Sequence, residues 1–385
     1  MNNNEKFIPL LKLNYSNEEI NYLQNGLKEV LNSGYLTMGE KVLEFEDKFR
    51  KFVGVKYAVA VNSGTSAIEI ILRSINVVKK SVVVPNITFM ATPLAAIHAG
   101  AKVIFVDVLP DNLSIDPNDL KNKIRDDTVA VIAVHIGGII SSSWNEINDI
   151  CEENDLFLLE DAAHAHGASF DGQIAGSLGF AGAFSFYPTK VLTTAEGGMI
   201  TTDSDQIYEQ SLVLREHGKK NPNINIHTEL GSNWRFSEIH ALLGLLEMKK
   251  CESIIKERQY LASIYDEELK GISNINKITI PKNIVSPYYK YIVYLNERYK
   301  RETIKNRMKS DFDISLPGEV YSHLCHSQPV FKKYPEFILN NEKDQFPGSQ
   351  YVADNQICLP LYPNLNKDEI KYVVDSLRYT IGSLN

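Results

Sequence analysis

Seven short apolar runs mark the first 250 positions of the chain, and amphipathic stretches separate them. The runs lie at 57–62, 81–84, 102–108, 129–136, 156–161, 182–186 and 198–202. Apolar runs of this length are typical of strands in a parallel sheet whose two faces are covered by helices. The pattern therefore predicts an α/β fold with a mostly parallel, seven-stranded sheet in residues 1–250.

A second, smaller unit is predicted after residue 250. A polar helical stretch from Ser237 to Leu269 leads out of the first unit, and apolar runs follow at 277–280 and 289–295. The chain of 385 residues is also too long for one compact core. We therefore predict a large domain at 1–250 and a small C-terminal α/β domain at 251–385.

The composition is that of an ordinary soluble globular protein, with 44% hydrophobic and 23% charged residues. The formal net charge is −8, so the chain lacks the excess of basic residues that is typical of nucleic-acid-binding proteins. The sequence contains no apolar stretch long enough for a membrane span, and Met1–Lys6 lacks the apolar core of a signal peptide. We expect a cytoplasmic protein that binds neither nucleic acid nor membranes.

The cysteines and histidines give little support for a metal site. The four cysteines are scattered and form no CxxC pair, as is usual in a reduced compartment. The stretch His323–His326 contains two histidines and a cysteine. Structural zinc sites normally bring a second ligand pair from elsewhere in the chain, so we expect no bound metal.

One lysine stands between an aromatic strand and a glycine-rich turn, in the segment from Ala183 to Gly198. Desolvation or a cationic neighbour lowers the pKa of such a lysine and makes its amine nucleophilic, so Lys190 is a candidate Schiff-base former. A surface lysine in a loop is the alternative. The upstream segments favour the reactive lysine, because they offer partners in the order that pyridoxal phosphate would require.

An acidic residue closes another apolar run. The segment Leu156–Asp161 predicts a buried strand that presents Asp161 at the sheet edge where ligands of α/β proteins bind. Beside the pyridine nitrogen of pyridoxal phosphate, this carboxylate would keep the nitrogen protonated. A helix N-cap is the alternative role for the aspartate.

Two further strand ends predict cofactor contacts. The strand from Tyr57 runs through the turn 63–66 into a helix, whose N–H groups, dipole and neighbouring hydroxyls would form an anion cradle fit for a phosphate. A plain helix cap is the alternative. After the strand at 82–84, Phe89 stands where an aromatic ring could stack on a flat cofactor, or it could be ordinary core.

Together these motifs resemble the DegT/DnrJ/StrS-type family of sugar aminotransferases, which are fold-type-I pyridoxal phosphate enzymes. The similarity covers nearly the whole chain. Its segments lie at 34–46, 62–67, 85–92, 134–138, 160–167, 184–198, 214–218, 231–236, 325–331 and 359–363. The resemblance implies a fold-type-I large domain, a smaller α/β domain and a homodimer with shared active sites.

The resemblance also implies roles for individual residues. Lys190 would bind pyridoxal 5′-phosphate through a Schiff base, and Asp161 would pair with the pyridine nitrogen. The other implied cofactor contacts are Gly64, Thr65 and Ser185 at the phosphate, Phe89 over the ring, His164 near the ring hydroxyl, and Asn233 from the second subunit. We predict substrate contacts for Arg235, Tyr321 and His326.

Three positions depart from the family pattern. His164 stands where many members have Gln; a histidine can donate the same hydrogen bond, but it adds a group that titrates near neutrality. Ala195 replaces the commoner Gly before Glu196, and Glu40 follows Gly39 where Pro is usual. The last two changes are expected to be tolerated in their turns.

The implied reaction is a ping-pong transamination. L-glutamate or L-glutamine would give its amino group to the cofactor, which passes through a pyridoxamine 5′-phosphate form. A keto-sugar, most often linked to a nucleotide, would receive the amino group in surface-polysaccharide or amino-sugar biosynthesis. A smaller ketone, such as a ketose phosphate or a keto-inositol, is the alternative acceptor.

Two other functions are compatible with the resemblance. Some relatives dehydrate sugars, but the best-known branch of these carries His at the position of Lys190. A non-enzymatic regulator is disfavoured by the intact set of Lys190, Asp161 and Ser185. The sequence therefore favours aminotransfer.

Overall fold

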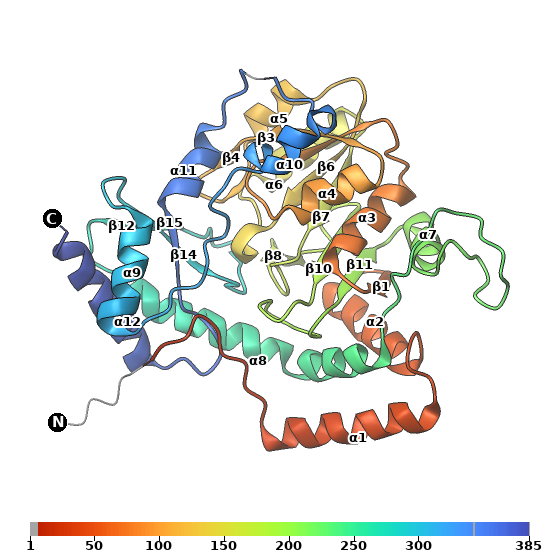
Figure 1. Ribbon diagram of the computed structural model, residues 1–385, viewed down its shortest axis with the longest axis horizontal. Coiled ribbons are helices and arrows are strands. Elements are labelled where there is room, and N and C mark those ends of the chain that lie inside the picture. Colours follow the sequence, from red (N-terminus) through yellow and green to blue (C-terminus); the bar gives the residue numbers. More distant parts are fainter. Residues whose placement is uncertain (1–6, 342, 385) are drawn as a thin grey trace.

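A computed structural model describes residues 7–341 and 343–384. Its centre is a seven-stranded sheet in the order β1-β11-β10-β7-β6-β2-β3 (Figure 1). Strand β11 runs antiparallel to both neighbours, and the other strands are parallel to one another. The bounds are Tyr57–Val61 (β1), Ser81–Pro85 (β2), Lys102–Val106 (β3), Thr128–Val134 (β6), Phe157–Asp161 (β7), Ala181–Ser185 (β10) and Gly198–Thr202 (β11). This confirms the predicted mostly parallel sheet.

Helices cover both faces of this sheet, which explains why its strands are apolar throughout. One face carries α3 (Gly64–Ser74), α4 (Ala91–His98) and α7 (Asp205–Arg215). The other carries α2 (Glu40–Val53), α5 (Pro117–Lys123), α6 (Trp144–Glu153) and the first part of α8 (Glu238–Glu268). Successive residues of a strand point to opposite faces. Accordingly, Val82 and Val84 join the core on the α3 side, whereas Val83 joins the core on the α2 side.

A smaller α/β part follows the large sheet, as predicted. Its antiparallel sheet has the order β12-β14-β15, with bounds Ile275–Lys277, Tyr291–Leu295 and Gln356–Leu359. Helices α9 (Arg301–Phe312) and α12 (Lys367–Gly382) pack with the end of α8 around a separate core. Tyr265, Val293 and Val374 are fully buried in this core.

Helix α8 joins the two parts. It contacts α2 near its start and α12 farther along, and Figure 1 shows it running beneath the molecule from one part to the other. Ser237 caps its N-terminus by accepting a hydrogen bond from the His240 N–H. The domain division predicted at residues 250 and 251 falls inside this helix and stays a prediction.

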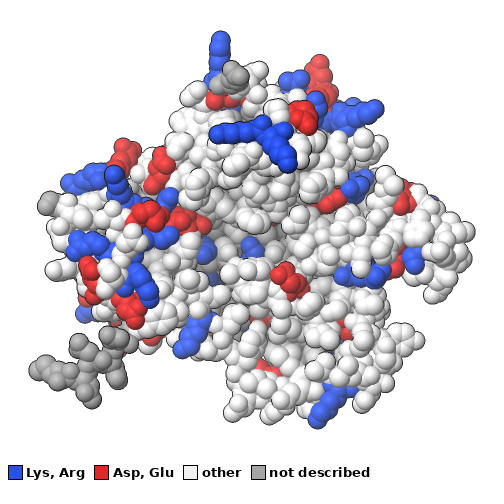
Figure 2. Space-filling model, viewed as in Figure 1, with Lys and Arg blue, Asp and Glu red and all other residues white. Residues whose placement is uncertain are grey.

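The remaining elements lie around these two sheets. Helix α1 (Asn17–Ser33) packs on the outer side of α8 (Figure 1). The short elements are β4 (Val108–Leu109), β5 (Ser114–Ile115), β8 (Ser169–Phe170), β9 (Gln173–Ile174), β13 (Ile284–Val285), α10 (Pro329–Lys333), α11 (Pro347–Asn355) and three 3₁₀ turns at Ile136–Gly138, Cys325–Ser327 and Pro335–Phe337. Within residues 7–341 and 343–384, no helix is long and apolar enough to cross a membrane. Figure 2 shows basic and acidic side chains intermixed on one face.

Candidate active site

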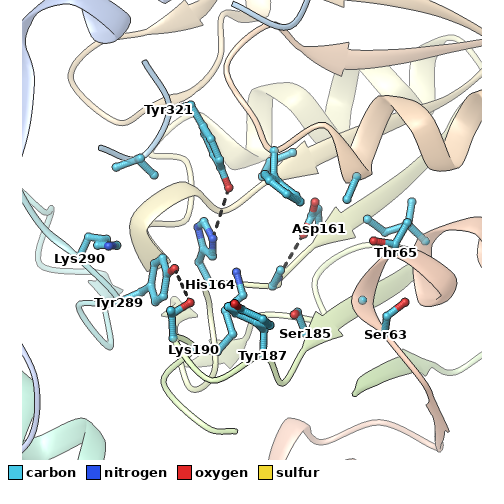
Figure 3. Close-up of a pocket in the computed structure, with 18 of the residues that line it drawn as sticks. Ser63, Thr65, Asp161, His164, Ser185, Tyr187, Lys190, Tyr289, Lys290 and Tyr321 are labelled. Atoms are coloured by element: carbon cyan, nitrogen blue, oxygen red, sulfur yellow. Dashed lines mark hydrogen bonds between the residues drawn. The ribbon is translucent and has the colours of Figure 1, made fainter. Parts of the chain in front are cut away.

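A cavity of about 540 Å³ opens at the carboxyl edge of the large sheet. Strands β1, β2, β7 and β10 end there, at the edge where ligands of open α/β sheets bind. We call the residues that these strand ends contribute the sheet wall: Ser63, Gly64, Thr65, Asp161, Ser185 and Lys190. The opposite side, the C-terminal wall, consists of Tyr289, Lys290, Glu319 and Tyr321. Figure 3 shows Ser63 and Thr65 at one end of the cavity and Lys290 at the other.

The start of α3 is suited to hold an anion. Ser63 caps the helix by accepting a hydrogen bond from the Ser66 N–H at 3.1 Å, and the first N–H groups of a helix have no acceptor within it. Gly64 is required by space, because a Cβ at this position would lie 2.8 Å from Ser185 Cβ. The backbone, the helix dipole and the nearby hydroxyls of Thr65 and Ser185 therefore form a cradle for a phosphate.

Two phenylalanines aim Ser185 at this cradle. Phe184 and Phe186 are fully buried on the opposite face of the sheet and pack edge-on against Phe49, with ring centroids 4.9 and 5.4 Å away. Burying each ring contributes about 1.5–3 kcal/mol of stability. Because strand residues alternate between faces, fixing the two rings leaves Ser185 on the cavity side.

Asp161 ends strand β7 and is only 6% exposed. Its carboxylate accepts hydrogen bonds from Thr92 Oγ1 at 2.7 Å and from the Ala163 N–H at 3.2 Å. Burial raises the pKa of Asp161, while these two hydrogen bonds oppose the rise. No ion pair to Asp161 is present in the described part of the chain, so the carboxylate is suited to a cationic group brought in by a ligand.

The neighbouring Glu160 fixes the direction of Asp161. Its carboxylate accepts hydrogen bonds from three backbone N–H groups at 2.7–2.8 Å and lies 2.9 Å from His135 Nε2. None of these four partners lines the cavity. Because adjacent strand residues point to opposite faces, anchoring Glu160 directs Asp161 into the cavity.

Lys190 lies in the turn after β10, and its side chain reaches the middle of the cavity (Figure 3). Its backbone N–H donates to Tyr187 O at 2.9 Å. Removal from water lowers the pKa of Lys190 to about 8; the charge of Asp161 opposes this decrease and that of Lys290 adds to it. An amine with this pKa can act as a nucleophile and can exchange a proton near neutral pH.

His164 lies between the two walls in a fixed orientation. Its Nδ1 accepts a hydrogen bond from the Gly137 N–H at 3.3 Å, so the ring proton of the neutral imidazole is on Nε2, which lies 3.4 Å from the Tyr321 hydroxyl. The ring stacks on Tyr289 with centroids 4.1 Å apart. Burial and the charge of Lys190 lower the pKa of His164 well below its usual value. The expectation that this histidine titrates near neutrality is therefore wrong.

The C-terminal wall carries aromatic rings and a second lysine. Tyr289 Oη lies 3.2 Å from Thr189 Oγ1, and its ring centroid is 5.0 Å from Lys190 Nζ. Lys290 Nζ lies 5.5 Å from the same centroid. Both ammonium groups therefore lie near one aromatic ring, and both face the space between the walls (Figure 3).

Comparison with known proteins identifies the family. A sequence model of the DegT/DnrJ/EryC1/StrS aminotransferase family matches residues 17–378. This protein belongs to that family. The chain is 31% identical to the spore coat polysaccharide biosynthesis protein SpsC of Bacillus subtilis, over 91% of this chain and 92% of SpsC. It is 27% identical to GDP-perosamine synthase of Vibrio cholerae, over 96% of this chain and 98% of that protein.

The fold also matches solved structures of the family. The crystal structure of DesV from S. venezuelae superposes with a TM-score of 0.89 at 26% identity, covering 97% of this chain and 98% of DesV. The sequence-based resemblance and the predicted fold class are thereby confirmed. The protein is an aminotransferase of a family whose members act on sugars, including nucleotide-linked sugars.

Most of the predicted site residues meet in this one aminotransferase cavity. Those that line it are Gly64, Thr65, Phe89, Asp161, His164, Ser185, Lys190 and Tyr321. Phe89 is 62% exposed, and its ring centroid lies 6.2 Å from that of Tyr321. The roles assigned to these residues in binding and catalysis stay predictions.

Three predicted residues do not line the cavity. Asn233 is exposed, and its backbone forms an isolated antiparallel β-bridge with Glu216. Arg235 forms an ion pair with the Glu216 carboxylate at 2.9 Å. His326 Nδ1 lies 2.8 Å from Asn86 Nδ2, and its ring packs on Phe346. His326 thus holds the turn at 325–327 against the end of β2 in this chain.

The sequence analysis missed Thr92, Tyr289, Lys290 and Glu319. Thr92 lies in the motif 85–92, three residues after Phe89. Its place in that motif was a signal from which a role at the site could have been predicted. Tyr289 and Lys290 were assigned only to an apolar strand of the small domain, and nothing in their spacing connects them to Lys190. No group of three or more potential metal ligands is present among the described residues.

Proposed function

We propose that this protein transfers the amino group of L-glutamate or L-glutamine to the keto group of a nucleotide-linked sugar, with pyridoxal 5′-phosphate as its cofactor. The observation that carries the proposal is one cavity that combines an anion cradle, a buried carboxylate with no ion-pair partner among the described residues, and a lysine with a pKa of about 8. These three groups match the phosphate, the ring nitrogen and the aldehyde of this cofactor.

The residues present fit the cofactor. Gly64, Thr65 and Ser185 would hold its phosphate, and the contact between Gly64 and Ser185 explains why no side chain can occupy the cradle. Asp161 would hold a proton on the ring nitrogen, because a buried carboxylate stabilises a nearby positive charge. His164 would donate its Nε2 proton to a ring oxygen.

When bound, pyridoxal phosphate supplies a ring that accepts the electron pair released as a C–H bond of the amino donor breaks. Lys190 would hold the cofactor between reactions and then, with its amine free, move a proton to and from the reacting carbon. Its pKa of about 8 suits both directions of this transfer, since neither protonation state is strongly disfavoured near neutral pH.

The acceptor class rests on the relatives. SpsC is named for polysaccharide biosynthesis, and GDP-perosamine synthase is named for a nucleotide-linked amino sugar. We propose a related keto-sugar as acceptor for this chain. Lys190 at the reactive position argues against the dehydratase alternative.

We also propose a homodimer with shared sites. Asn233 and Arg235 do not line this chain's cavity; they follow a loop after α7 and are held against the end of that helix through Glu216. The loop between α7 and α8 projects from the molecule (Figure 1). Large apolar side chains near α1 and α2 are also exposed, including Leu31 (57%), Tyr35 (73%), Leu36 (50%) and Leu43 (60%). Exposed apolar side chains that lie together on a surface are typical of protein interfaces, so we propose this region as the interface.

Absorbance spectroscopy tests the aminotransfer step. Adding L-glutamate or L-glutamine to the purified protein with its cofactor is expected to shift the cofactor band, and adding the correct ketone is expected to restore it. A panel of nucleotide-linked keto-sugars, ketose phosphates and keto-inositols would identify the acceptor. A cofactor band that responds to neither donor would contradict the proposal.

Mixing two inactive variants tests the shared site. Lys190→Ala and Asn233→Asp each damage one half of the proposed site. In Asn233→Asp, the introduced carboxylate would repel the cofactor phosphate. After subunit exchange, a hybrid dimer is expected to regain activity in the one site that contains both intact residues. If exchange is demonstrated by mass and no activity returns, the shared-site proposal is wrong.

A further inference from the structure

The far end of the cavity holds a lysine that neither the proposed cofactor nor the proposed proton transfer uses. Lys290 lines the cavity wall opposite Ser63 and Thr65, and Figure 3 shows its side chain directed inward. Its Nζ lies 3.4 Å from Gly318 O, a long contact to a neutral acceptor. In the described part of the chain, no carboxylate forms an ion pair with Lys290.

The acidic residue beside Lys290 is already paired with other cations. The Glu319 carboxylate accepts a hydrogen bond from Lys305 Nζ at 2.6 Å and lies 3.6 Å from Arg301 Nε. Its charge is therefore compensated from outside the cavity. This leaves the Lys290 side chain without an ion-pair partner among the described residues, and burial lowers the pKa of its amine. A positive charge that faces the ligand space is costly to hold away from water unless an anion meets it.

The backbone before Lys290 is held firmly in place. Arg258, only 4% exposed, donates to Tyr288 O from Nε at 3.1 Å and from Nη2 at 2.9 Å, and to Tyr289 O from Nη2 at 2.9 Å. Tyr288 has a φ of 50°, which costs a non-glycine residue about 1–3 kcal/mol. The buried guanidinium keeps this strained turn closed, and the turn directs Tyr289 and Lys290 into the cavity.

We propose that Lys290 binds an anionic oxygen group of a substrate, a carboxylate or a phosphate, at the end of the cavity remote from the cofactor phosphate. The inference rests on the proposed function, since that function requires acidic substrates. The donor supplies carboxylates, and a nucleotide-linked acceptor supplies a diphosphate. Because the Lys190 and Lys290 ammonium groups share the Tyr289 ring, an anion on Lys290 would lie close to the reacting centre.

Calorimetric titration of the holoenzyme tests this inference without turnover. The probes are glutarate, which has the carboxylates of the donor but no amino group, and uridine and guanosine diphosphates. Lys290→Met removes the charge and keeps an unbranched side chain one atom shorter, whereas Lys290→Arg keeps the charge. Lys282→Met, at an exposed position on the same part of the chain, is the matched control.

We expect Lys290→Met to weaken at least one probe by about tenfold or more, since breaking a close charge pair has a large effect on affinity. Lys290→Arg should stay within about threefold of the natural chain, and Lys282→Met should be unchanged. Loss confined to glutarate assigns the site to the donor carboxylate, and loss confined to the diphosphates assigns it to the acceptor. Loss of both assigns it to both substrates.

Unchanged binding of every probe in Lys290→Met would overturn the inference, as would failure of the natural chain to bind any probe. Thermal unfolding of each variant separates a folding defect from a binding defect, and Lys290→Gln, which also removes the charge, takes the place of Lys290→Met if that variant unfolds. If the natural chain binds glutarate through Lys290 but shows no spectral response to L-glutamate or L-glutamine, the aminotransfer proposal fails while the anion site stands.

Discussion

The sheet wall and the C-terminal wall face each other across one cavity but are built in different ways. The sheet wall uses strand ends, a helix start and small residues, and its critical positions are fixed by the backbone: Gly64 has no room for a side chain, and Asp161 ends a buried strand. The C-terminal wall uses long side chains on a turn, with Tyr289 and Lys290 held from behind by Arg258.

We propose that this difference separates two tasks, cofactor binding on the sheet wall and substrate binding on the C-terminal wall. A cofactor common to a family needs a phosphate cradle and a carboxylate in constant positions, which strand ends of a packed sheet provide. Substrates differ between relatives, and side chains on a turn can change without disturbing the sheet. We therefore expect substitutions in the sheet wall to abolish chemistry and substitutions in the C-terminal wall to change affinity.

Lys190→Ala gives the largest expected effect. Turnover should fall by at least about 10³-fold, because no other amine on the sheet wall can take over its proton transfer. Steady-state kinetics of Lys190→Ala measure the loss. Lys282→Ala is the control and is expected to match the natural chain. Activity above a few per cent in Lys190→Ala would remove this lysine from its proposed role.

Asp161→Asn should bind cofactor but slow turnover by about 10²-fold, since an amide cannot stabilise a positive charge on the ring nitrogen. The absorbance of bound cofactor checks binding, and the rate of its change on adding L-glutamate checks the chemistry. A variant that reacts at nearly the natural rate would reassign Asp161 to a structural cap of the segment 161–163.

Gly64→Ala should weaken cofactor binding by about tenfold, because the new methyl group meets Ser185 and crowding of this kind typically costs about 1–3 kcal/mol. Gly382→Ala is the control, since a Cβ there meets nothing within 4 Å. Equilibrium titration with pyridoxal phosphate measures both. Equal affinities in the two variants would show that the cradle lies elsewhere.

The smallest expected effect concerns the electrostatic coupling of the two walls, measured through the pKa of Lys190. Competitive acetylation of the cofactor-free protein between about pH 6 and pH 10 should show the Lys190 amine becoming reactive as the pH rises through about 8, well below the usual value for lysine. Lys290→Met should move this midpoint upward, because a repelling charge is removed. Asp161→Asn should move it downward. No shift in either variant would mean that the walls are not electrostatically coupled.

Much of the fold could be predicted because buried strands leave a direct trace in the sequence. All seven strands of the large sheet appear at the predicted positions, with ends shifted by at most two residues. Continuous apolar runs such as 81–85 are typical of strands in a sheet that is covered on both faces. The domain boundary is less visible, because α8 continues without interruption from one part to the other.

The positions on the sheet wall could be predicted from strand ends, whereas on the C-terminal wall only Tyr321 was named in advance, through the family resemblance. Asp161 ends a strand and Lys190 follows one, so their position at the sheet edge can be inferred from the apolar runs beside them. Tyr289 and Lys290 reach the cavity through a turn whose direction depends on Arg258, a residue 30 positions away, and on a left-handed φ at Tyr288. Neither feature leaves a periodic signal, so only the folded chain reveals that Tyr289 and Lys290 belong to this wall.

The most direct test of the account is to locate the covalent link between the protein and its cofactor. The purified protein with pyridoxal phosphate would be reduced with borohydride, digested and mapped by mass spectrometry. We predict that the reduced cofactor is found on Lys190 and that Lys290, which lies near the same Tyr289 ring, stays unmodified. Modification of Lys290 in place of Lys190, or no modification of either lysine, would contradict the assignment of the two walls.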